Sequence, residues 1–182
     1  MDIAELEDFL SYQRAIRSFD TSRPVDEATV ETLLRCATFA PSGGNRQTWR
    51  FIVLRDAAIK AELTQVYAEE AQKYLGRPLE GQTPWTDVPV LIVACSEKGG
   101  GGPSIFPAVQ NLLLAARALG LGSVLTTLWK GQEPRVRRAL GVPDEIEMHA
   151  VVPIGWPDRK YGRGKRKPIA EVTYRDRLGN AW

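Results

Sequence analysis

The chain has 182 residues, of which 43% are hydrophobic and 25% are charged, and its formal net charge is +2. This composition suits one compact globular domain over residues 1–182 and excludes an intrinsically disordered chain. No apolar run approaches the ~20 residues that span a bilayer, and the N-terminus lacks the basic region of a secretory signal, so we expect a cytoplasmic protein with no membrane partner.

Hydrophobic periodicity and helix-ending residues predict a mixture of helices and strands. We expect helices over 8–16, 27–40, 56–75, 104–119 and 133–140, and strands over 50–56, 88–96, 123–129 and 149–156. The segment 76–87 is either a lid with Trp85 as a stacking residue or a plain surface loop. The glycine-rich segment 99–103 is interpreted as a flexible connection, because no Lys-Ser or Lys-Thr follows it as a P-loop requires. The order of elements lacks strict strand–helix–strand repetition.

The segment 104–119 is the most hydrophobic of the predicted helices, and it is apolar on nearly every side apart from Gln110, Asn111 and Arg117. A helix of this kind must be buried all round. A small domain has little interior with which to surround it, so the pattern favours a subunit interface over its outer face. Gly120 and Gly122, which follow, are interpreted as a helix cap and its turn.

The single histidine, His149, limits the chemistry that the polypeptide can perform. It lies in a predicted strand and the chain has no nucleophile elbow, which argues against Ser-His-Asp hydrolysis. One histidine also excludes a His-rich zinc site. Cys36 and Cys95 lack a CxxC arrangement and are interpreted as buried thiols. We therefore expect no metal site, and we expect any chemistry to come from a bound cofactor.

The stretch "APSGGNRQTWRF", residues 40–51, joins a predicted helix to a predicted strand. Pro41, Gly43 and Gly44 end the helix and permit a close approach of the main chain to a ligand. Asn45 and Gln47 add amide groups that both donate and accept hydrogen bonds, which suits a flat polar heterocycle. The alternative is an ordinary helix-to-strand turn in which Asn45 satisfies its own backbone.

Basic residues gather near both ends of the chain. Residues 158–167 carry six cations and one anion, a net charge of +5, so the rest of the chain carries −3. This segment is either a solvated basic loop or part of a phosphate-binding site, and the negative remainder argues against a nucleic-acid partner. Arg14 and Arg17 are spaced i, i+3, so at a helix end both would point the same way. They either form surface salt bridges or converge with Arg166 on one dianion.

Four blocks of the sequence, in order, are "QRAIRSFD", "APSGGNRQTWRFIVLRD", "AVQNLLLAARALGLGS" and "KRKPIAEVTYRD". Together they resemble the nitroreductase-like family of flavin mononucleotide (FMN) enzymes, from about Phe9 to Arg177. The resemblance implies a nitroreductase-like α+β fold, with a central mixed β-sheet flanked by helices. It also implies an interlocked homodimer that binds FMN where the two subunits meet, with a basic C-terminal extension from about residue 157.

The same resemblance implies a set of cofactor-binding residues: Gln13, Arg14, Arg17, Pro41, Ser42, Gly43, Asn45, Gln47, Thr126, Thr127, Leu128 and Arg166. Gln13 replaces a common arginine of the family's N-terminal basic motif, and Ala15 replaces a common serine. In the family, the motif that matches residues 41–49 reaches the flavin from the neighbouring subunit, and here Thr48 replaces its second proline. Residues 126–128 match the segment near the reactive edge of the flavin ring, and Arg166 matches a basic residue near the phosphate.

The resemblance implies an FMN-dependent oxidoreductase in which the flavin carries the chemistry, so no catalytic residue is required of the polypeptide. NADH or NADPH would donate the hydride, and a small nitroaromatic or quinone would accept electrons in a ping-pong cycle. Relatives that dehalogenate, oxidise peptides or fragment the flavin leave the substrate open, and a deazaflavin donor is a further alternative. From a different class, the chain could be a non-catalytic flavin-binding protein for storage or sensing.

Overall fold

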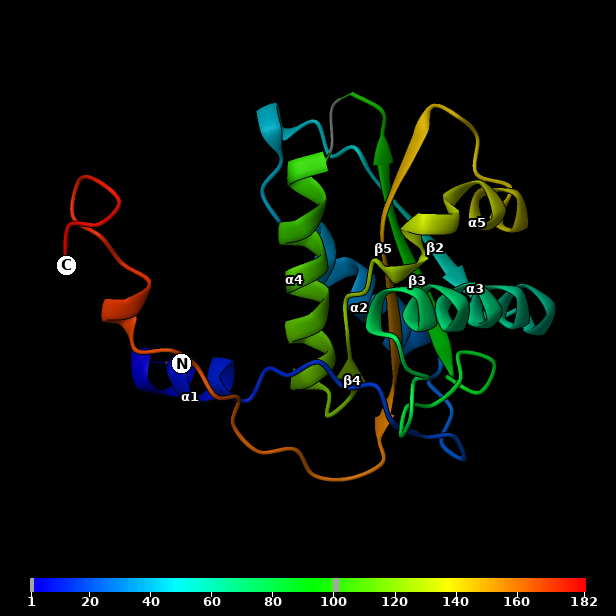
Figure 1. Cartoon of the computed structure of the whole chain (residues 1–182), viewed down its shortest axis with the longest axis horizontal. Coiled ribbons are helices and arrows are strands. Elements are labelled where there is room, and N and C mark those ends of the chain that lie inside the picture. Colours follow the sequence, from blue (N-terminus) through cyan, green and yellow to red (C-terminus); the bar gives the residue numbers. More distant parts are fainter. Residues whose placement is uncertain (1, 100–101) are drawn as a thin grey trace. The chain divides into compact units, whose positions relative to one another are not determined.

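A single β-sheet organises the computed structural model of the chain, which describes residues 2–99 and 102–182 (Figure 1). The strands are ordered β1 (Phe19–Asp20), β5 (Ile146–Pro157), β3 (Val90–Glu97) and β2 (Trp49–Leu54), and β4 (Gly122–Ser123) pairs with β5 beside this path. Every ladder is antiparallel, and among the described residues parallel pairing is confined to the Ala15–Ser123 bridge. The predicted α+β fold is confirmed, and that bridge is the only parallel component of the described sheet.

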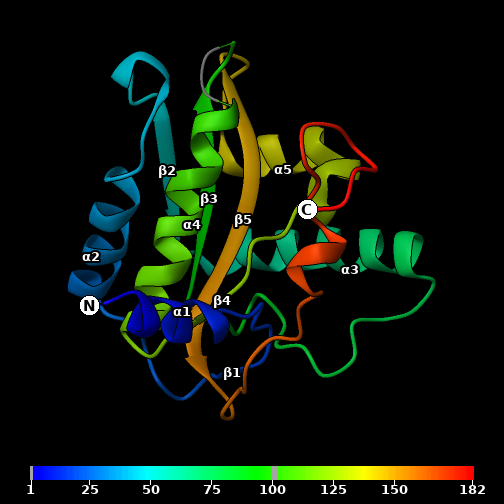
Figure 2. The same cartoon turned by 90° about the vertical axis from the view of Figure 1, so that its left-hand side faces the viewer.

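Two helical layers bury the sheet. Val90, Ile92 and Ala94 of β3 pack in one core cluster with α2 (Glu27–Thr38) and α4 (Gly102–Ala118). The helices α3 (Ala57–Leu75) and α5 (Glu133–Leu140) lie on the opposite face (Figures 1 and 2). Alternate side chains of a strand point to opposite faces. Since helices cover both faces, β3 is buried along its whole length except at Glu97.

Most of the predicted elements are confirmed to within a few residues, including α3, α5, β3 and β5. The predicted strand 123–129 is wrong. Strand pairing there stops at Ser123 and returns only as a bridge between Thr126 and Val151, and residues 128–132 form the 3₁₀ helix η2 (Leu128–Gln132). The predicted connection 99–103 includes residues 100 and 101, which lie outside the described residues. Within the described ranges no helix is both long and apolar enough to cross a membrane.

The chain divides into two units, Arg14–Lys160 and a smaller unit of Met1–Gln13 with Tyr161–Trp182. In the smaller unit, α1 (Ile3–Ser11) begins with a reciprocal capping box. The Asp2 carboxylate accepts from the Glu5 N–H at 2.9 Å, and the Glu5 carboxylate accepts from the Asp2 N–H at 2.8 Å. The predicted helix 8–16 is therefore wrong at both ends. The described residues of this unit, including the short helix η3 (Ile169–Glu171), contain no buried residue.

Gly122 permits close packing between β4 and the segment that carries Ile16. A Cβ atom at this position would lie 2.6 Å from Cγ2 and 2.9 Å from Cβ of Ile16, closer than side chains pack. Ile16 is buried at 6% exposure, and its N–H donates to the Ser123 carbonyl oxygen at 3.0 Å. Gly122 is thus a strand residue whose missing side chain lets the Ile16 segment lie against β4, and not only part of a turn.

We predict that Gly122→Ala destabilises the protein by about 1–3 kcal/mol, because Ile16 must leave its rotamer or its place in the core. Urea denaturation at equilibrium measures this change. Gly162→Ala serves as the control, since a Cβ atom there meets nothing within 4 Å. Equal stability of the two variants would contradict the close packing of Ile16 on Gly122.

Candidate functional site

The segment that carries Arg14 and Arg17 is extended. Its Ala15 forms a bridge with Ser123 of β4, and its Ile16 points into the core. Arg14 and Arg17 are both exposed. The expectation that they share one side of a helix end is wrong, because α1 ends at Ser11 and pairing with Ser123 keeps the following residues extended.

The turn between α2 and β2 contains two non-glycine residues in the left-handed region. Asn45 has a φ of 53° and Gln47 a φ of 51°, next to Gly44 at 59°. Such angles in residues with side chains cost about 1–3 kcal/mol and cluster at ligand-binding sites. All three residues are exposed, as are Pro41 and Gly43.

Hydrogen bonds within the turn show what the Asn45 side chain binds. The Ser42 hydroxyl accepts from the Gln47 N–H at 3.0 Å, so Ser42 caps this backbone group. The side-chain oxygen Oδ1 of Asn45 accepts from the side-chain amide of Gln47 at 3.2 Å. The Asn45 side chain therefore pairs with another amide and not with its own backbone. One donor group on Asn45 and one acceptor on Gln47 remain outside this bond.

Residues 126–128 connect the sheet edge to η2. Thr126 exchanges backbone hydrogen bonds of 3.0 Å with Val151 in both directions, and its side chain is buried. Its hydroxyl accepts from the Leu128 N–H at 3.5 Å. Thr127, between the buried Thr126 and the half-buried Leu128, is exposed. A ligand at this edge would meet Thr127 and the main chain.

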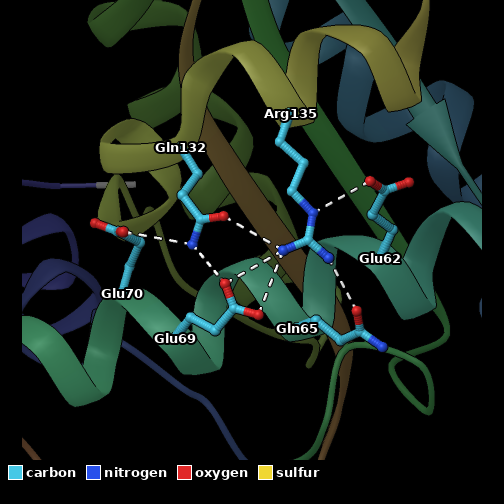
Figure 3. A network of polar contacts seen from close by, with 6 residues as sticks. All are labelled: Glu62, Gln65, Glu69, Glu70, Gln132 and Arg135. Atoms are coloured by element: carbon cyan, nitrogen blue, oxygen red, sulfur yellow. Dashed lines mark hydrogen bonds and ion pairs between the residues drawn. The ribbon is translucent and has the colours of Figure 1, made fainter.

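A polar network fixes η2 against α3 (Figure 3). Arg135 of α5 donates to Glu62 at 3.3 Å, to Gln65 at 2.9 Å and to Glu69 at 3.2 Å. Gln132 adds a bond of 2.8 Å to Glu69, and this bond lowers the pKa of that carboxyl, with Arg135 contributing. Because Arg135 binds several partners through one planar group, the network orients η2 more firmly than an isolated surface pair would.

The backbone of η2 also rests directly on a buried carboxylate. A Cβ atom at Gly131 would lie 1.8 Å from Oε2 of Glu70, so a side chain there would displace the Glu70 carboxylate. Glu70 is 3% exposed, and its Oε2 has no hydrogen-bond partner among the described residues. This contact and the Arg135 network fix the end of the segment 126–132 on α3.

The amide-rich turn and the arginine segment are connected, through strand pairing, to different points along β5. Trp49, next to the amide-rich turn, pairs with Ser96, which pairs with Glu147 of β5. Ser123, next to the arginine segment, pairs with Ile154. These two points of β5 are about 20 Å apart at the usual rise per residue. Figure 1 shows η1 (Gly43–Asn45) and β4 at opposite ends of α4. One chain does not bring the turn and the arginines together.

The basic C-terminal segment is bound to α1 within the smaller unit. Arg163 forms an ion pair with Asp8, and the Gly164 N–H donates to the Ser11 carbonyl oxygen at 3.0 Å. Arg166 donates to the Gln13 carbonyl oxygen at 3.4 Å. The segment is therefore not simply a loop in solvent. Gln13 and Arg166 are neighbours, while Arg14 and Arg17 belong to the other unit, so the convergence of all three arginines stays a prediction.

The segment 76–87, predicted as a lid or a surface loop, is anchored in its second half. Trp85 is 4% exposed and stacks on Tyr67 of α3 with ring centroids 4.2 Å apart. It is thus a buried anchor and not a stacking platform for a ligand. A hollow lies between α3 and this segment, and a smaller one is lined by Arg17, Gln82 and Thr83.

His149 pairs with a serine, but the pair is not a hydrolytic dyad. Ser96 Oγ lies 2.7 Å from Nε2 of His149, and Ser96 is fully buried, so no substrate reaches its hydroxyl. Burial lowers the pKa of His149, while Glu147 opposes the shift and Lys130 adds to it. Burial also raises the pKa of Cys95 to about 11, which makes it an inert thiol as expected. Cys36 is half-buried.

Comparison with known proteins gives one consistent family. Residues 10–156 match the Nitroreductase family. The chain is 32% identical over 161 residues to the Archaeoglobus fulgidus protein named "Putative NADH dehydrogenase/NAD(P)H nitroreductase", covering 80% of this chain and 81% of that one. It is 32% identical over 200 residues to 5,6-dimethylbenzimidazole synthase of Rhodospirillum rubrum, covering 96% and 88%.

A solved structure supports the same grouping. The crystal structure of an oxidised iodotyrosine deiodinase bound to FMN and 3-iodo-L-tyrosine superposes with a TM-score of 0.80 at 26% identity. The match covers 95% of this chain and 99% of that one. A nearly complete superposition of both chains means that the fold described above is shared from end to end.

We predict that stability falls as the pH drops from 7.5 to 5.5, partly through His149. Its pKa is lowered in the native state, so the unfolded chain, with a histidine pKa of about 6.5, binds a proton that the native state does not. The contribution of His149 to stability is therefore fully present above about pH 6.5 and decreases as the pH falls below that value. Urea midpoints across the range measure the effect, and His149→Gln should show a flatter dependence. The same slope in both proteins would contradict the neutral, buried imidazole.

Proposed function

The chain belongs to the nitroreductase family, and from this premise we propose that it is an FMN-dependent oxidoreductase. NADH or NADPH would supply the hydride, and a small electrophile of the nitroaromatic or quinone class would take up the electrons in a ping-pong cycle. The observation that carries the proposal is the set of donors: two exposed arginines on a fixed extended segment, and a strained turn rich in amides.

The residues present fit FMN. The guanidinium groups of Arg14 and Arg17 can bind the two charges of a phosphate with paired donors. Arg166, which donates to the Gln13 carbonyl oxygen, is the second candidate for this end. The amides of Asn45 and Gln47, with Pro41, Ser42 and Gly43, match the alternating donors and acceptors of the flavin's pyrimidine edge. Thr126, Thr127 and Leu128 would line the edge of the ring. When bound, FMN supplies the hydride-transfer chemistry.

The residue types on the segments proposed to contact the flavin support the proposed acceptor class. The segments 14–17, 42–47 and 126–128 contain no Asp, Glu, His, Lys or Cys. A substrate that needs a protein acid or base would find none on these segments. Nitro groups and quinones accept a hydride or an electron pair and take their protons from water. One relative is named for NAD(P)H nitroreduction, which agrees with this acceptor class and with a nicotinamide donor.

We further propose that the whole chain is a single FMN-binding domain and that a homodimer completes the site. The turn of one chain lies about 20 Å along β5 from its own arginine segment, so the turn would serve the ligand bound by the second copy. Phe39 and Phe106 of the α2 and α4 layer are 76% and 43% exposed. None of the described residues of the smaller unit is buried, and its Leu178 and Trp182 are 88% and 68% exposed. A second copy would cover these surfaces.

The activity is tested by the flavin spectrum of the purified protein. We expect FMN absorbance to bleach when NADH or NADPH is added without oxygen, and to return when a quinone or nitroarene follows, because the two half-reactions are separate. Binding of FMN without reduction by either nucleotide would refute the proposed donor and favour a storage or sensing protein. Failure to bind FMN at all would refute the proposal.

Removing the arginines tests the phosphate site. We predict that Arg14→Ala and Arg17→Ala each raise the dissociation constant for FMN by about 10- to 100-fold, as expected for a lost charged hydrogen bond of about 1.5–3 kcal/mol. Affinity for riboflavin, which lacks the phosphate, should not change. Arg138→Ala, at an exposed position on α5, is the matched control. Equal losses for FMN and riboflavin would place the phosphate elsewhere.

A further inference from the structure

Thr83 makes two hydrogen bonds to the segment that carries Arg17. Its N–H donates to the Arg17 carbonyl oxygen at 2.9 Å, and its hydroxyl oxygen accepts from the Phe19 N–H at 2.8 Å. The two bonds lie on either side of Ser18, so they hold the segment at two points. Removing one of them would leave a single pivot beside Arg17.

The other attachments of this segment are made by the residues on either side of Arg17 and not by Arg17 itself. Before Arg17, the Ile16 N–H donates to Ser123. After it, Ser18 is bonded to Asp158 and β1 pairs with the end of β5. The Arg17 carbonyl oxygen itself is bonded to Thr83. Thr83 is therefore the residue that holds the Arg17 backbone directly.

Thr83 is itself held firmly by α3. Two residues later, Trp85 is buried against Tyr67 in a stacked pair whose ring planes differ by 22°. The Thr86 N–H donates to the Thr64 hydroxyl at 3.0 Å. The Lys60 side chain donates to the Val88 carbonyl oxygen at 2.6 Å. Residues 83–88 are thus a rigid support, and they transmit the position of α3 to the Arg17 segment.

Arg17 and Thr83 also face the same small space. Both line the same small hollow, together with Gln82 and Val124. A long arginine side chain has many rotamers, and binding a phosphate restricts them. A fixed Arg17 backbone and the hollow beside it reduce the number of side-chain orientations that Arg17 loses when it binds a phosphate.

We propose that Thr83 is a positioning residue for phosphate recognition, acting through the backbone of Arg17. This inference rests on the proposed function, because it assigns Arg17 to the FMN phosphate. Thr83 touches no ligand; it sets how well Arg17 discriminates a ligand that carries the phosphate from one that lacks it. The segment 76–87 is then part of the cofactor site through its second half.

The test measures dissociation constants of FMN and riboflavin for the apoprotein by fluorescence titration. Thr83→Val keeps the shape and the N–H of Thr83 but removes the hydroxyl acceptor, and it should weaken FMN binding about fivefold, the usual effect of one neutral hydrogen bond. Riboflavin binding should not change. Thr83→Ser, which retains a hydroxyl, should restore FMN affinity. Thr86→Val makes the same chemical change at an exposed position of the same segment and should have no effect.

Coupling to Arg17 separates positioning from a general structural role. In an Arg17→Ala background, Thr83→Val should cause no further loss of FMN affinity, because the group that it positions is absent. An equal loss for FMN and riboflavin, an unchanged FMN affinity, or a full additional loss in the Arg17→Ala background would each overturn the inference. Thr83→Ala gives the same comparison should the valine variant fail to fold.

The outcomes also distinguish this inference from the proposed function. If the wild-type protein binds no FMN, or if Arg17→Ala binds FMN as tightly as the wild type, the proposed phosphate site is wrong and the inference falls with it. If Arg17→Ala loses FMN affinity selectively and Thr83→Val does not, the site stands and the role of Thr83 alone is refuted.

Discussion

The extended segment from Ile16 to Phe19 is held by hydrogen bonds to three separate parts of the chain: Ser123, Thr83 and Asp158. These bonds force Ile16 and Phe19 into the core, where they are 6% and 5% exposed, and leave Arg17 outside. The contact of Ile16 with Gly122 then sets where β4 lies against the segment. Arginines on a freely moving linker would have to be ordered by each ligand, which would weaken binding by the entropy lost.

The amide-rich turn shows a second constraint, local strain. Left-handed angles at Asn45 and Gln47 are unfavourable, and they persist where surrounding contacts determine them. Here the Ser42 hydroxyl caps the Gln47 N–H, and Ser104 at the start of α4 accepts from the Trp49 indole and from the Gly43 N–H. Because these hydrogen bonds hold the strained backbone before and after Asn45, the amides of the turn are kept in one arrangement.

The relatives of this chain show what the fold leaves open. They share the family and are named for nitroreduction, dimethylbenzimidazole synthesis and deiodination. One scaffold therefore supports several reactions, and the choice among them depends on the residues around the ligand. In this chain the segments proposed to contact the flavin carry amides, hydroxyls and arginines but no acid or base. Under the proposed function the polypeptide would bind and orient FMN, and the cofactor would supply the chemistry.

The sequence by itself determined the elements whose hydrophobic period is long and regular, such as α3, α5 and the continuous apolar strand β3. It also contained the start of α1, because the spacing of Asp2 and Glu5 is that of a capping box, a signal that the predicted helix 8–16 overlooked. The grouping of Pro41, Ser42, Asn45 and Gln47 as a special turn was equally visible, since glycines and amides have distinct backbone preferences. Only the tertiary structure decided that the Arg14–Arg17 segment is extended, that strand pairing stops after Ser123 and that Trp85 is an anchor. The arginine segment is extended because Ile16 and Arg17 bind Ser123 and Thr83, and Trp85 is an anchor because it stacks on Tyr67. The pairing of residues 122–126 depends in the same way on β5. Local periodicity carries no information about such distant partners.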